Sequence, residues 1–356
     1  MNKRLYLAIA ATLVLFACSK KNDVTPTPPK ADSATGVYVL TEGAFNGNNA
    51  GLSFYDIKTK QLSLHLFASV NQRALGDVAN DIAIYGSKMY IVVNNSNNVE
   101  IMDAHTVKSL ATIHVDNLQP RHIAFANGKA YVTSYAGKLL VIDTATNQVA
   151  NTATIRPGAE GIVIVNNKVY IGVPGVWPSS NQTILSVLDL NTLAEQKTLT
   201  VGPNPNQLAT DQYDHLLVLC AGDYDKVPPS LATISLLDDK VLQNDTTVKA
   251  DNIAIYRNRA YLYKSTYKDD SKQPVMVYNL ATGKLQDGNF ITDGTTVGYY
   301  YGISADAVTG DVYVTDALSY GSSKAKVTCF DSNGKTRFTI ALNDYASFAS
   351  KVIFLR

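Results

Sequence analysis

Four short runs of alternating apolar and polar residues, separated by turn sequences, fill residues 120–155 and constrain the fold more than any other segment. Ile123 and Phe125 alternate in the first run, and the following turn has Asn127 and Gly128 at its centre, a strong signal for a tight β-hairpin. A single four-stranded sheet leaves both of its faces uncovered, whereas repeated sheets cover one another by stacking. The segment therefore predicts one unit of a repeated all-β fold.

The same pattern recurs along the chain with a spacing of about 40–50 residues, which is typical of four-stranded propeller blades. Seven copies are counted on the second run of each, at Tyr38, Tyr90, Tyr131, Tyr170, Leu217, Tyr261 and Tyr313. The third run usually ends at a polar residue before a turn, as at Asp56, Asp103, Asp143, Asp189, Asn279 and Asp331. The sequence thus predicts an all-β fold, a seven-bladed β-propeller, over residues 36–356.

The first copy lacks its first strand, because the pattern begins at Val37 with residues that match a second strand. The missing strand is found at the other end of the sequence, where residues 350–355 match the first strand at residues 121–125. We therefore expect the C-terminal strand to pair with the N-terminal blade. This pairing closes the ring and removes the exposed sheet edges that a β-protein must otherwise protect.

The N-terminus has the features of a bacterial lipoprotein leader. Lys3 and Arg4 precede an apolar run that is too short to remain as a membrane span, and a cleavage box ends at Cys18. Residues 1–17 are therefore predicted to be a signal peptide, Cys18 the lipidated residue, and residues 18–35 a polar tether. An ordinary signal peptide followed by a chance cysteine is the alternative.

Composition argues against several classes of function. The 31 basic residues nearly balance the 30 acidic residues, and no basic run is present, so no nucleic-acid partner is expected. The five histidines include no pair at ligand spacing, and we predict neither a metal site nor a cofactor. Cys220 and Cys329 fall in strands of non-adjacent copies, which favours buried free thiols over a disulfide. The propeller is expected to be monomeric.

The predicted loops differ in length between the two faces of the propeller. The turns that join first to second strands and third to fourth strands are short, whereas the loops from second to third strands are long and varied. Varied loops on a rigid scaffold commonly carry binding sites. These loops and the blade-to-blade connections place a candidate ligand-binding rim on one face: Phe45, Arg73, Arg121, Tyr135, Arg156, Trp177, Tyr224, Tyr267, Tyr300 and Tyr320. Alternatively, each loop folds over its own blade, with its aromatic residue as a local packing contact.

Three carboxylates precede predicted first strands and could approach the mouth of the central channel: Asp81, Glu160 and Asp251. A glycosidase needs two carboxylates at a set separation, and the sequence does not determine the separation of these three. A propeller hydrolase or lactonase therefore remains an alternative to a binding protein. Charged residues at the channel mouth are also common in propellers that have no catalytic activity.

Two sequence features resemble a known family. One is the opening motif at residues 38–43 and 46–56, and the other is the recurring pattern Ile-Ala, Lys-x-Tyr-Ile and Val-Ile-Asp-x-x-Thr. Together they look like the YncE-like seven-bladed propeller lipoproteins of Bacteroidetes, over nearly all of the chain after the leader. The resemblance implies a surface protein that captures vitamin B12 and passes it to a TonB-dependent outer-membrane transporter.

The function expected from the residues and the resemblance is that of a non-enzymatic outer-membrane lipoprotein that binds a small molecule on the long-loop face. The resemblance suggests cobalamin or a related corrinoid as the ligand and a TonB-dependent transporter as the partner. Residues 19–23 resemble the polar tail that directs some of these lipoproteins to the cell surface, which favours surface exposure over the periplasmic face. A scaffold that binds a protein or a glycan at the cell envelope is the alternative, and a propeller hydrolase or lactonase is the second.

Replacing Cys18 by Ala tests the lipoprotein prediction. The acyl anchor is covalent at the Cys18 thiol, so we expect Cys18→Ala to leave the membrane fraction, either as soluble protein or as unprocessed precursor. Fractionation of cells with immunoblotting measures this, and Cys220→Ala is the matched control that should remain with the membrane. An unchanged membrane fraction with cleavage at the same site would rule the lipidation out.

Overall fold

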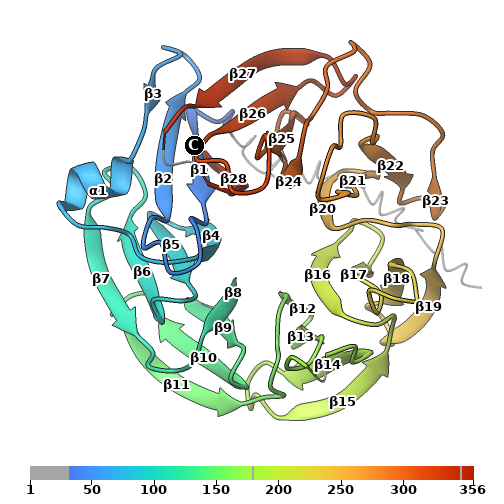
Figure 1. The fold of residues 1–356 in the computed structure, drawn as a ribbon. Helices are drawn as coiled ribbons and strands as arrows, with labels where there is room; N and C mark the ends of the chain where they lie inside the picture. The colour runs from blue at the N-terminus through green and yellow to red at the C-terminus, as the bar shows by residue number, and fades with distance from the viewer. Residues whose placement is uncertain (1–31, 179, 345–346) are drawn as a thin grey trace, which may run out of the picture. The chain divides into compact units, whose positions relative to one another are not determined.

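The computed structural model describes residues 32–178, 180–344 and 347–356, and residues 33–356 form one unit. The predicted signal peptide, Cys18 and most of the tether lie outside the described residues. The unit contains seven antiparallel four-stranded sheets, or blades, placed in sequence around a common centre (Figure 1). The predicted seven-bladed β-propeller is therefore confirmed. Within the described residues, no helix is long and apolar enough to cross a membrane.

Each blade runs from an inner strand near the centre to an outer strand at the periphery. In this order, blade one consists of β28 (Ala349–Leu355), β1 (Gly36–Thr41), β2 (Gly51–Asp56) and β3 (Leu62–Ser63). Blade two consists of β4 (Ala79–Tyr85), β5 (Lys88–Val93), β6 (Asn98–Asp103) and β7 (Ser109–His114). Blade three consists of β8 (Pro120–Ala126), β9 (Lys129–Ser134), β10 (Lys138–Asp143) and β11 (Gln148–Thr154).

The remaining blades follow the same order. Blade four consists of β12 (Ile162–Val165), β13 (Lys168–Val173), β14 (Ile184–Asp189) and β15 (Glu195–Thr200). Blade five consists of β16 (Pro205–Thr210), β17 (His215–Cys220), β18 (Ser230–Ser235) and β19 (Lys240–Asp245). Blade six consists of β20 (Asn252–Tyr256), β21 (Arg259–Tyr263), β22 (Met276–Asn279) and β23 (Lys284–Leu285). Blade seven consists of β24 (Tyr300–Ala305), β25 (Val312–Asp316), β26 (Ala325–Phe330) and β27 (Thr336–Leu342), and one short helix, α1 (Leu66–Asn71), follows β3.

Local turn chemistry accounts for the short loops. Asn127 and Gly128 both have positive φ, 50° and 72°, as the tightest hairpin turns require, and they join β8 to β9. After the third strand of blade three, Asp143 Oδ1 accepts hydrogen bonds from the backbone N–H groups of Ala145 (3.0 Å) and Thr146 (2.8 Å). The bond from Thr146 is the main reason that the pKa of Asp143 is below its usual value. The polar residue predicted at the end of the third strand therefore forms the turn that follows.

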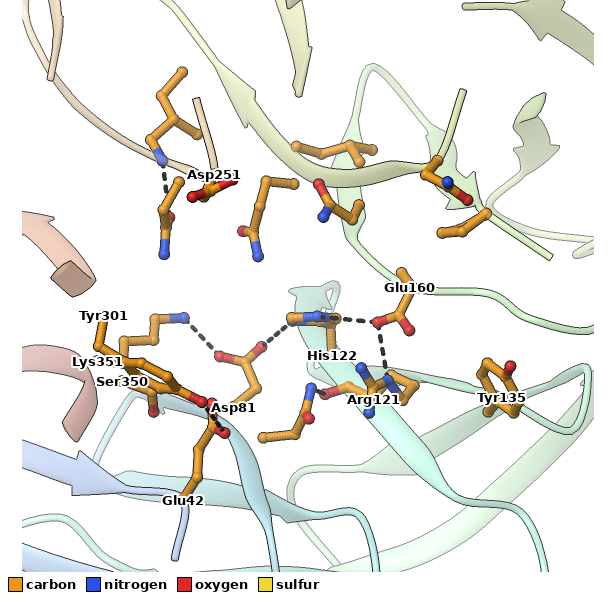
Figure 2. Close-up of a pocket in the computed structure, with 18 of the residues that line it drawn as sticks. Glu42, Asp81, Arg121, His122, Tyr135, Glu160, Asp251, Tyr301, Ser350 and Lys351 are labelled. Carbon is orange, nitrogen blue, oxygen red and sulfur yellow. Dashed lines mark hydrogen bonds and ion pairs between the residues drawn. The ribbon is translucent and has the colours of Figure 1, made fainter. Parts of the chain in front are cut away.

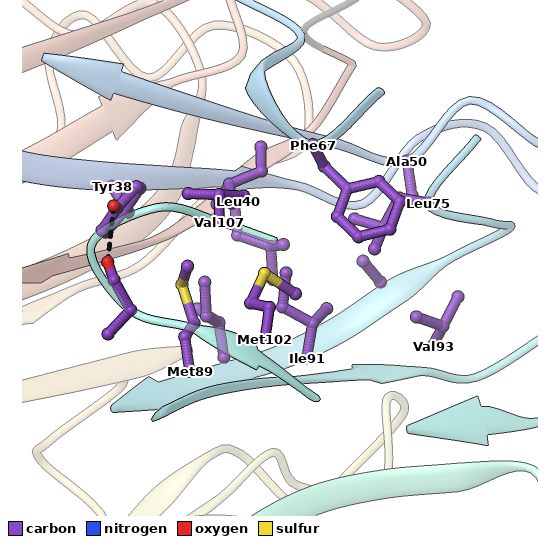
Figure 3. Packing of buried hydrophobic residues seen from close by; sticks show 14 of the residues in the cluster. Tyr38, Leu40, Ala50, Phe67, Leu75, Met89, Ile91, Val93, Met102 and Val107 are labelled. Atoms are coloured by element: carbon purple, nitrogen blue, oxygen red, sulfur yellow. Dashed lines mark hydrogen bonds between the residues drawn. The ribbon is translucent and has the colours of Figure 1, made fainter. Parts of the chain in front are cut away.

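Apolar side chains fill the interfaces between blades, and each of the seven interfaces contains one buried cluster. Figure 3 shows the cluster between blades one and two, where Leu40, Met89 and Ile91 are fully buried. Tyr38 lies in the same cluster and donates its hydroxyl hydrogen to the carbonyl oxygen of Ala104 at 2.7 Å. Each sheet is therefore covered on both faces by its neighbours, as the repeat predicts.

Ring closure takes the predicted form. β28 pairs with β1 in antiparallel register, with Tyr38 opposite Ile353 and Val39 opposite Val352. β28 also contacts the inner strands of both neighbouring blades, β24 and β4 (Figure 1). The two cysteines in the described residues, Cys220 and Cys329, are buried and free, and burial raises the pKa of each thiol to about 12. The prediction of free thiols is thus confirmed.

Deleting residues 350–356 should abolish cooperative folding. The deletion removes most of β28, including the buried Val352 and Leu355, each of which contributes roughly 1.5–3 kcal/mol on burial. It also leaves the N–H and C=O groups of β1 that face β28 without partners, at about 1–3 kcal/mol for each group that stays dry. The sum is comparable with a net stability of roughly 5–15 kcal/mol. Circular dichroism during thermal unfolding measures the effect.

Lys240→Ala is the control for that deletion. Lys240 forms an ion pair with Asp238 in which both side chains are exposed, so its loss should change the melting temperature little. A truncated protein that melts cooperatively near the temperature of the full-length protein would show that β28 does not hold the ring together.

Candidate functional site

The inner strands are irregular where they begin, on the face that carries the long loops. In five of the seven blades the pairing of the inner strand shifts by at least one residue near its start. The residues left outside the ladder are Asn80, Arg121, His122, Asn206, Tyr301 and Ser350. Such bulges turn side chains away from the regular alternation of a strand. All six of these residues line one cavity.

This central cavity has a volume of about 800 Å³. Its floor is formed by the first residues of the inner strands, and its wall by the loops that follow the second strands of blades three, four and five, of which those of blades four and five are long. Tyr135, Trp177 and Tyr224 come from these loops. The size is in the range of small-molecule and cofactor sites.

A chain of five charged groups crosses the floor of the cavity (Figure 2). Lys351 Nζ lies 2.6 Å from Asp81 Oδ1, and Asp81 Oδ2 lies 3.4 Å from His122 Nδ1. The other ring nitrogen of His122 lies 3.6 Å from Glu160 Oε2, which accepts a hydrogen bond from Arg121 Nε at 2.9 Å. The chain links blades one, two, three and four, because each blade supplies charged side chains at the entry to its inner strand.

The protonation states of these five charged groups follow from the alternation of positive and negative charges among them. Burial alone would raise the pKa of Asp81, but Lys351 and His122 outweigh it and hold that pKa well below the usual range. Burial would likewise raise the pKa of Glu160, and Arg121 with His122 lowers it. Burial would lower the pKa of His122, whereas hydrogen bonds to Asp81 and Glu160 raise it. His122 is therefore stabilised as a cation between two carboxylates.

Two further carboxylates lie at the edge of the cavity. Glu42 follows β1 and accepts a hydrogen bond from the Tyr301 hydroxyl at 2.7 Å (Figure 2). Burial raises the pKa of Glu42 to about 7, against the opposing effects of Tyr301, Arg121 and His122. Asp251 precedes β20 and forms an ion pair with Lys264. Glu42 is thus the group in this cavity whose charge is expected to change near neutral pH.

Four of the ten residues predicted to form the rim line the cavity: Arg121, Tyr135, Trp177 and Tyr224. Trp177 is 78 % exposed and Tyr224 is 77 % exposed, so both present most of their surface to solvent. Tyr135 lies beside Trp177, since its hydroxyl oxygen accepts the backbone N–H of Trp177 at 2.8 Å. These three residues form the aromatic part of the cavity wall.

The other six predicted rim residues lie elsewhere. Arg73 and Arg156 form ion pairs with Glu100 and Glu195, each at 2.7 Å, beside third and fourth strands of their blades. Tyr300 is buried and donates its hydroxyl hydrogen to the carbonyl oxygen of Gln273, while the next residue in the chain lines the cavity instead. The remaining three are exposed residues of the long loops and do not line the cavity: Phe45, Tyr267 and Tyr320.

Several cavity residues were not among the predicted rim residues. Asp81, Glu160 and Asp251 were expected only to approach the channel mouth, and all three line the cavity. His122 and Lys351 were not predicted to belong to the site. In five of the seven blades, the residue directly before the Ile, Leu or Val at which the inner strand resumes its regular alternation lines the cavity: Asp81, His122, Gln207, Asn252 and Lys351.

The cavity is suited to binding a polar molecule. Each cation on its floor is compensated by a carboxylate, so the charge chain presents hydrogen-bonding groups without a strong excess of positive charge. The side-chain amides of Asn206 and Gln207 line the cavity, and among the described residues no hydrogen bond occupies them. Within the same residues, no group of three or more His, Cys, Asp or Glu side chains is placed to hold a metal ion.

The fold and the cavity define the class: a seven-bladed β-propeller with a polar cavity at the centre of its long-loop face. Residues 35–211 match the family model described as "Domain of unknown function (DUF5074)", a match that covers blades one to four apart from β28 and continues through β16. This match and the similar solved propellers are consistent with a propeller family. No curated protein matches the sequence.

Solved structures with the same architecture share little sequence with this chain. A quinonprotein alcohol dehydrogenase-like protein from Bacteroides thetaiotaomicron has a TM-score of 0.66 and 17 % identity, over 90 % of this chain and 78 % of that one. A functionally unknown protein from Desulfotomaculum acetoxidans has a TM-score of 0.66 and 13 % identity, over 91 % and 99 %. Kuenenia stuttgartiensis hydrazine synthase has a TM-score of 0.61 and 17 % identity, over 72 % and 77 %. At these identities the likeness shows the fold alone.

The raised pKa of Glu42 predicts a pH-dependent contribution to stability. The pKa of Glu42 rises from its ordinary value of 4.5 to about 7 in the folded protein. Between these two pH values the folded protein holds a proton at Glu42 that the unfolded chain releases. The free energy of unfolding therefore falls as the pH rises through this range. Glu42→Gln removes the ionisation. Between pH 4.5 and 7.5 the variant should therefore gain on the order of 1–3 kcal/mol relative to the unmodified protein.

Urea denaturation at several pH values measures this difference. Glu195→Gln is the control, because Arg156 lowers the pKa of Glu195, so that above about pH 5.5 this carboxylate is ionised in both the folded and the unfolded chain. The assignment would be contradicted if the free energies of unfolding of Glu42→Gln and of the unmodified protein changed in parallel from pH 4.5 to 7.5.

Proposed function

We propose that the protein binds a large, polar small molecule in the central cavity and does not alter it chemically. The observation that carries the proposal is the juxtaposition of an exposed aromatic wall and a polar floor around about 800 Å³. Trp177 and Tyr224 offer flat apolar surface, and Asn206 and Gln207 offer unoccupied amides. A rigid ring that holds these groups in advance keeps the ordering cost of binding low.

The charges of the cavity favour a ligand that contacts the cavity floor through neutral groups. The predicted rim includes three arginines, a residue type that suits a ligand phosphate. However, Arg73, Arg121 and Arg156 are each paired with a glutamate, and breaking such a pair would leave a carboxylate without its partner. Amide and hydroxyl groups, which both donate and accept hydrogen bonds, suit this floor better than an anion does.

A corrinoid is the specific ligand that we propose. It is a large amphipathic molecule with amides around its edge, and its apolar faces suit the wall formed by Tyr135, Trp177 and Tyr224. With the arginines paired, its phosphate would face solvent at the mouth of the cavity. The sequence resemblance leads to the same ligand and adds two further proposals. The protein is anchored in the outer membrane through Cys18, and it delivers the ligand to a TonB-dependent transporter.

The state of His122 supports a binding role over catalysis. A general base must have a free nitrogen near the working pH, and His122 is stabilised as a cation by Asp81 and Glu160. The two carboxylates are in turn held ionised by their cationic neighbours, so neither is suited to act as a general acid.

Titration with cobalamin tests the proposal. Trp177 is the only tryptophan of the chain and lies at the cavity, so its fluorescence should be quenched as cobalamin binds. Calorimetry should show saturable one-to-one binding. Tyr224→Ala should weaken binding by more than about 1 kcal/mol, or at least roughly fivefold, if this side chain is an anchor.

Tyr213→Ala is the matched control, because Tyr213 lies in the short turn between β16 and β17, at the opposite end of the strands. Its substitution should leave the affinity unchanged. Absence of both heat and quenching at high micromolar cobalamin would reject the corrinoid. Binding that survives combined loss of Trp177 and Tyr224 would reject the cavity as the site. Heat with a neutral oligosaccharide but not with cobalamin would keep the site and replace the ligand class.

A further inference from the structure

A second pocket lies between blades six and seven, on the face of the short turns. It has a volume of about 290 Å³ and is lined by the turn from β20 to β21, by the β24–β25 turn and by the β26–β27 turn. The lining residues are Tyr256, Arg257, Asn258, Arg259, Tyr261, Thr309, Ser332 and Asn333. None of them is acidic. This pocket is at the opposite end of the strands from the central cavity, and its role does not depend on the function proposed above.

The two arginines of this pocket differ from every other arginine that the structure describes. Five of the seven described arginines form an ion pair with a carboxylate: Arg73, Arg121, Arg156, Arg337 and Arg356. In the same described residues, Arg257 and Arg259 have no carboxylate within ion-pair distance. Two uncompensated guanidinium groups are therefore brought to one concave site that holds no acid.

Contacts within the pocket hold both arginines near the protein surface. The Arg257 guanidinium lies over the Tyr256 ring, 5.1 Å from its centroid. Arg259 uses one Nη group to donate a hydrogen bond to the carbonyl oxygen of Ser332 at 3.2 Å, which ties blade six to blade seven. Its other N–H groups remain for a ligand, because a guanidinium carries five donors. Ordered arginines lose less conformational entropy when they bind an anion.

A buried hydroxyl in the lining gives an independent indication. Tyr261 lines the pocket with none of its surface exposed, and its hydroxyl has no hydrogen-bond partner among the described residues. Arg259 lies close enough to oppose the rise in the pKa that burial gives Tyr261, but an arginine cannot accept the hydroxyl proton. Buried polar groups without partners are rare in native proteins, and a bound acceptor would satisfy this one.

We infer that this pocket binds a tetrahedral oxyanion, the phosphate or sulfate group of a small molecule or of a lipid. Two guanidinium groups, the amides of Asn258 and Asn333 and the Tyr261 hydroxyl are all donors, and a tetrahedral oxyanion has enough acceptor oxygens to use them. The adjoining pocket, of about 270 Å³, shares Arg259, Ser332 and Asn333 and gives room for the group that carries the anion.

Calorimetric titration with inorganic phosphate and with sodium sulfate, at constant ionic strength set with chloride, tests the inference. The protein should bind at least one of these anions saturably with one site. Arg257→Gln combined with Arg259→Gln should weaken that binding by roughly tenfold or more. Arg156→Gln removes a surface arginine that is already paired with Glu195 and should leave the affinity unchanged.

Tyr261→Phe keeps the test decisive if the double variant does not fold. It removes only a hydroxyl that has no partner in the unliganded protein, so the melting temperature should not fall, whereas anion affinity should. Vesicles of phosphatidylglycerol, compared with phosphatidylcholine, separate the two sources of the anion. Arginine-dependent binding to the former indicates a lipid, and binding of the free anions alone indicates a soluble ester. Equal affinities in the unmodified and double-variant proteins, or no binding in any titration, would overturn the inference.

Discussion

The burial of each sheet by its two neighbours is the interaction on which the rest of this structure depends. A blade taken alone would expose two apolar faces, and seven separate buried clusters, one at each blade-to-blade interface, show how the ring resolves this. Because each cluster needs both of its blades, no blade can be removed without exposing the next. The pairing of β28 with β1 completes the seventh interface and gives every blade two neighbours.

A rigid ring lets the central cavity hold charges that would be costly elsewhere. Asp81, His122 and Glu160 belong to three different blades. Their positions are fixed because the sheet of each of these blades packs against a neighbouring sheet on both faces. Alternating charges from Lys351 to Arg121 attract one another, and this attraction offsets the cost of burying the five charged groups. The same compensation removes the arginines as free anion ligands, and the two arginines that remain uncompensated lie on the other face.

Most of the fold could be predicted from the sequence, because it is encoded locally and repeated. Alternation, Asn-Gly turns and the Asp at the end of third strands predict seven blades, and the match between residues 350–355 and the other first strands predicts the closure. The site was predicted less completely, since it depends on which way a few side chains point. A bulge makes Tyr301 line the cavity and buries Tyr300, and periodicity cannot place such a shift. Arg73 and Arg156 lie outside the cavity and pair with Glu100 and Glu195, which the sequence does not reveal because these partners lie far from them along the chain.

Lys351 belongs to β28, the strand that closes the ring, so the cavity is complete only after this strand is in place. A chain is synthesised from its N-terminus, so β28 emerges after the other six blades are complete. Until β28 inserts beside β1, Asp81 has no lysine beside it and one side of the cavity floor is open. A nascent or clipped chain that lacks β28 therefore has an incomplete cavity floor. The central cavity is completed in one step, when β28 pairs with β1.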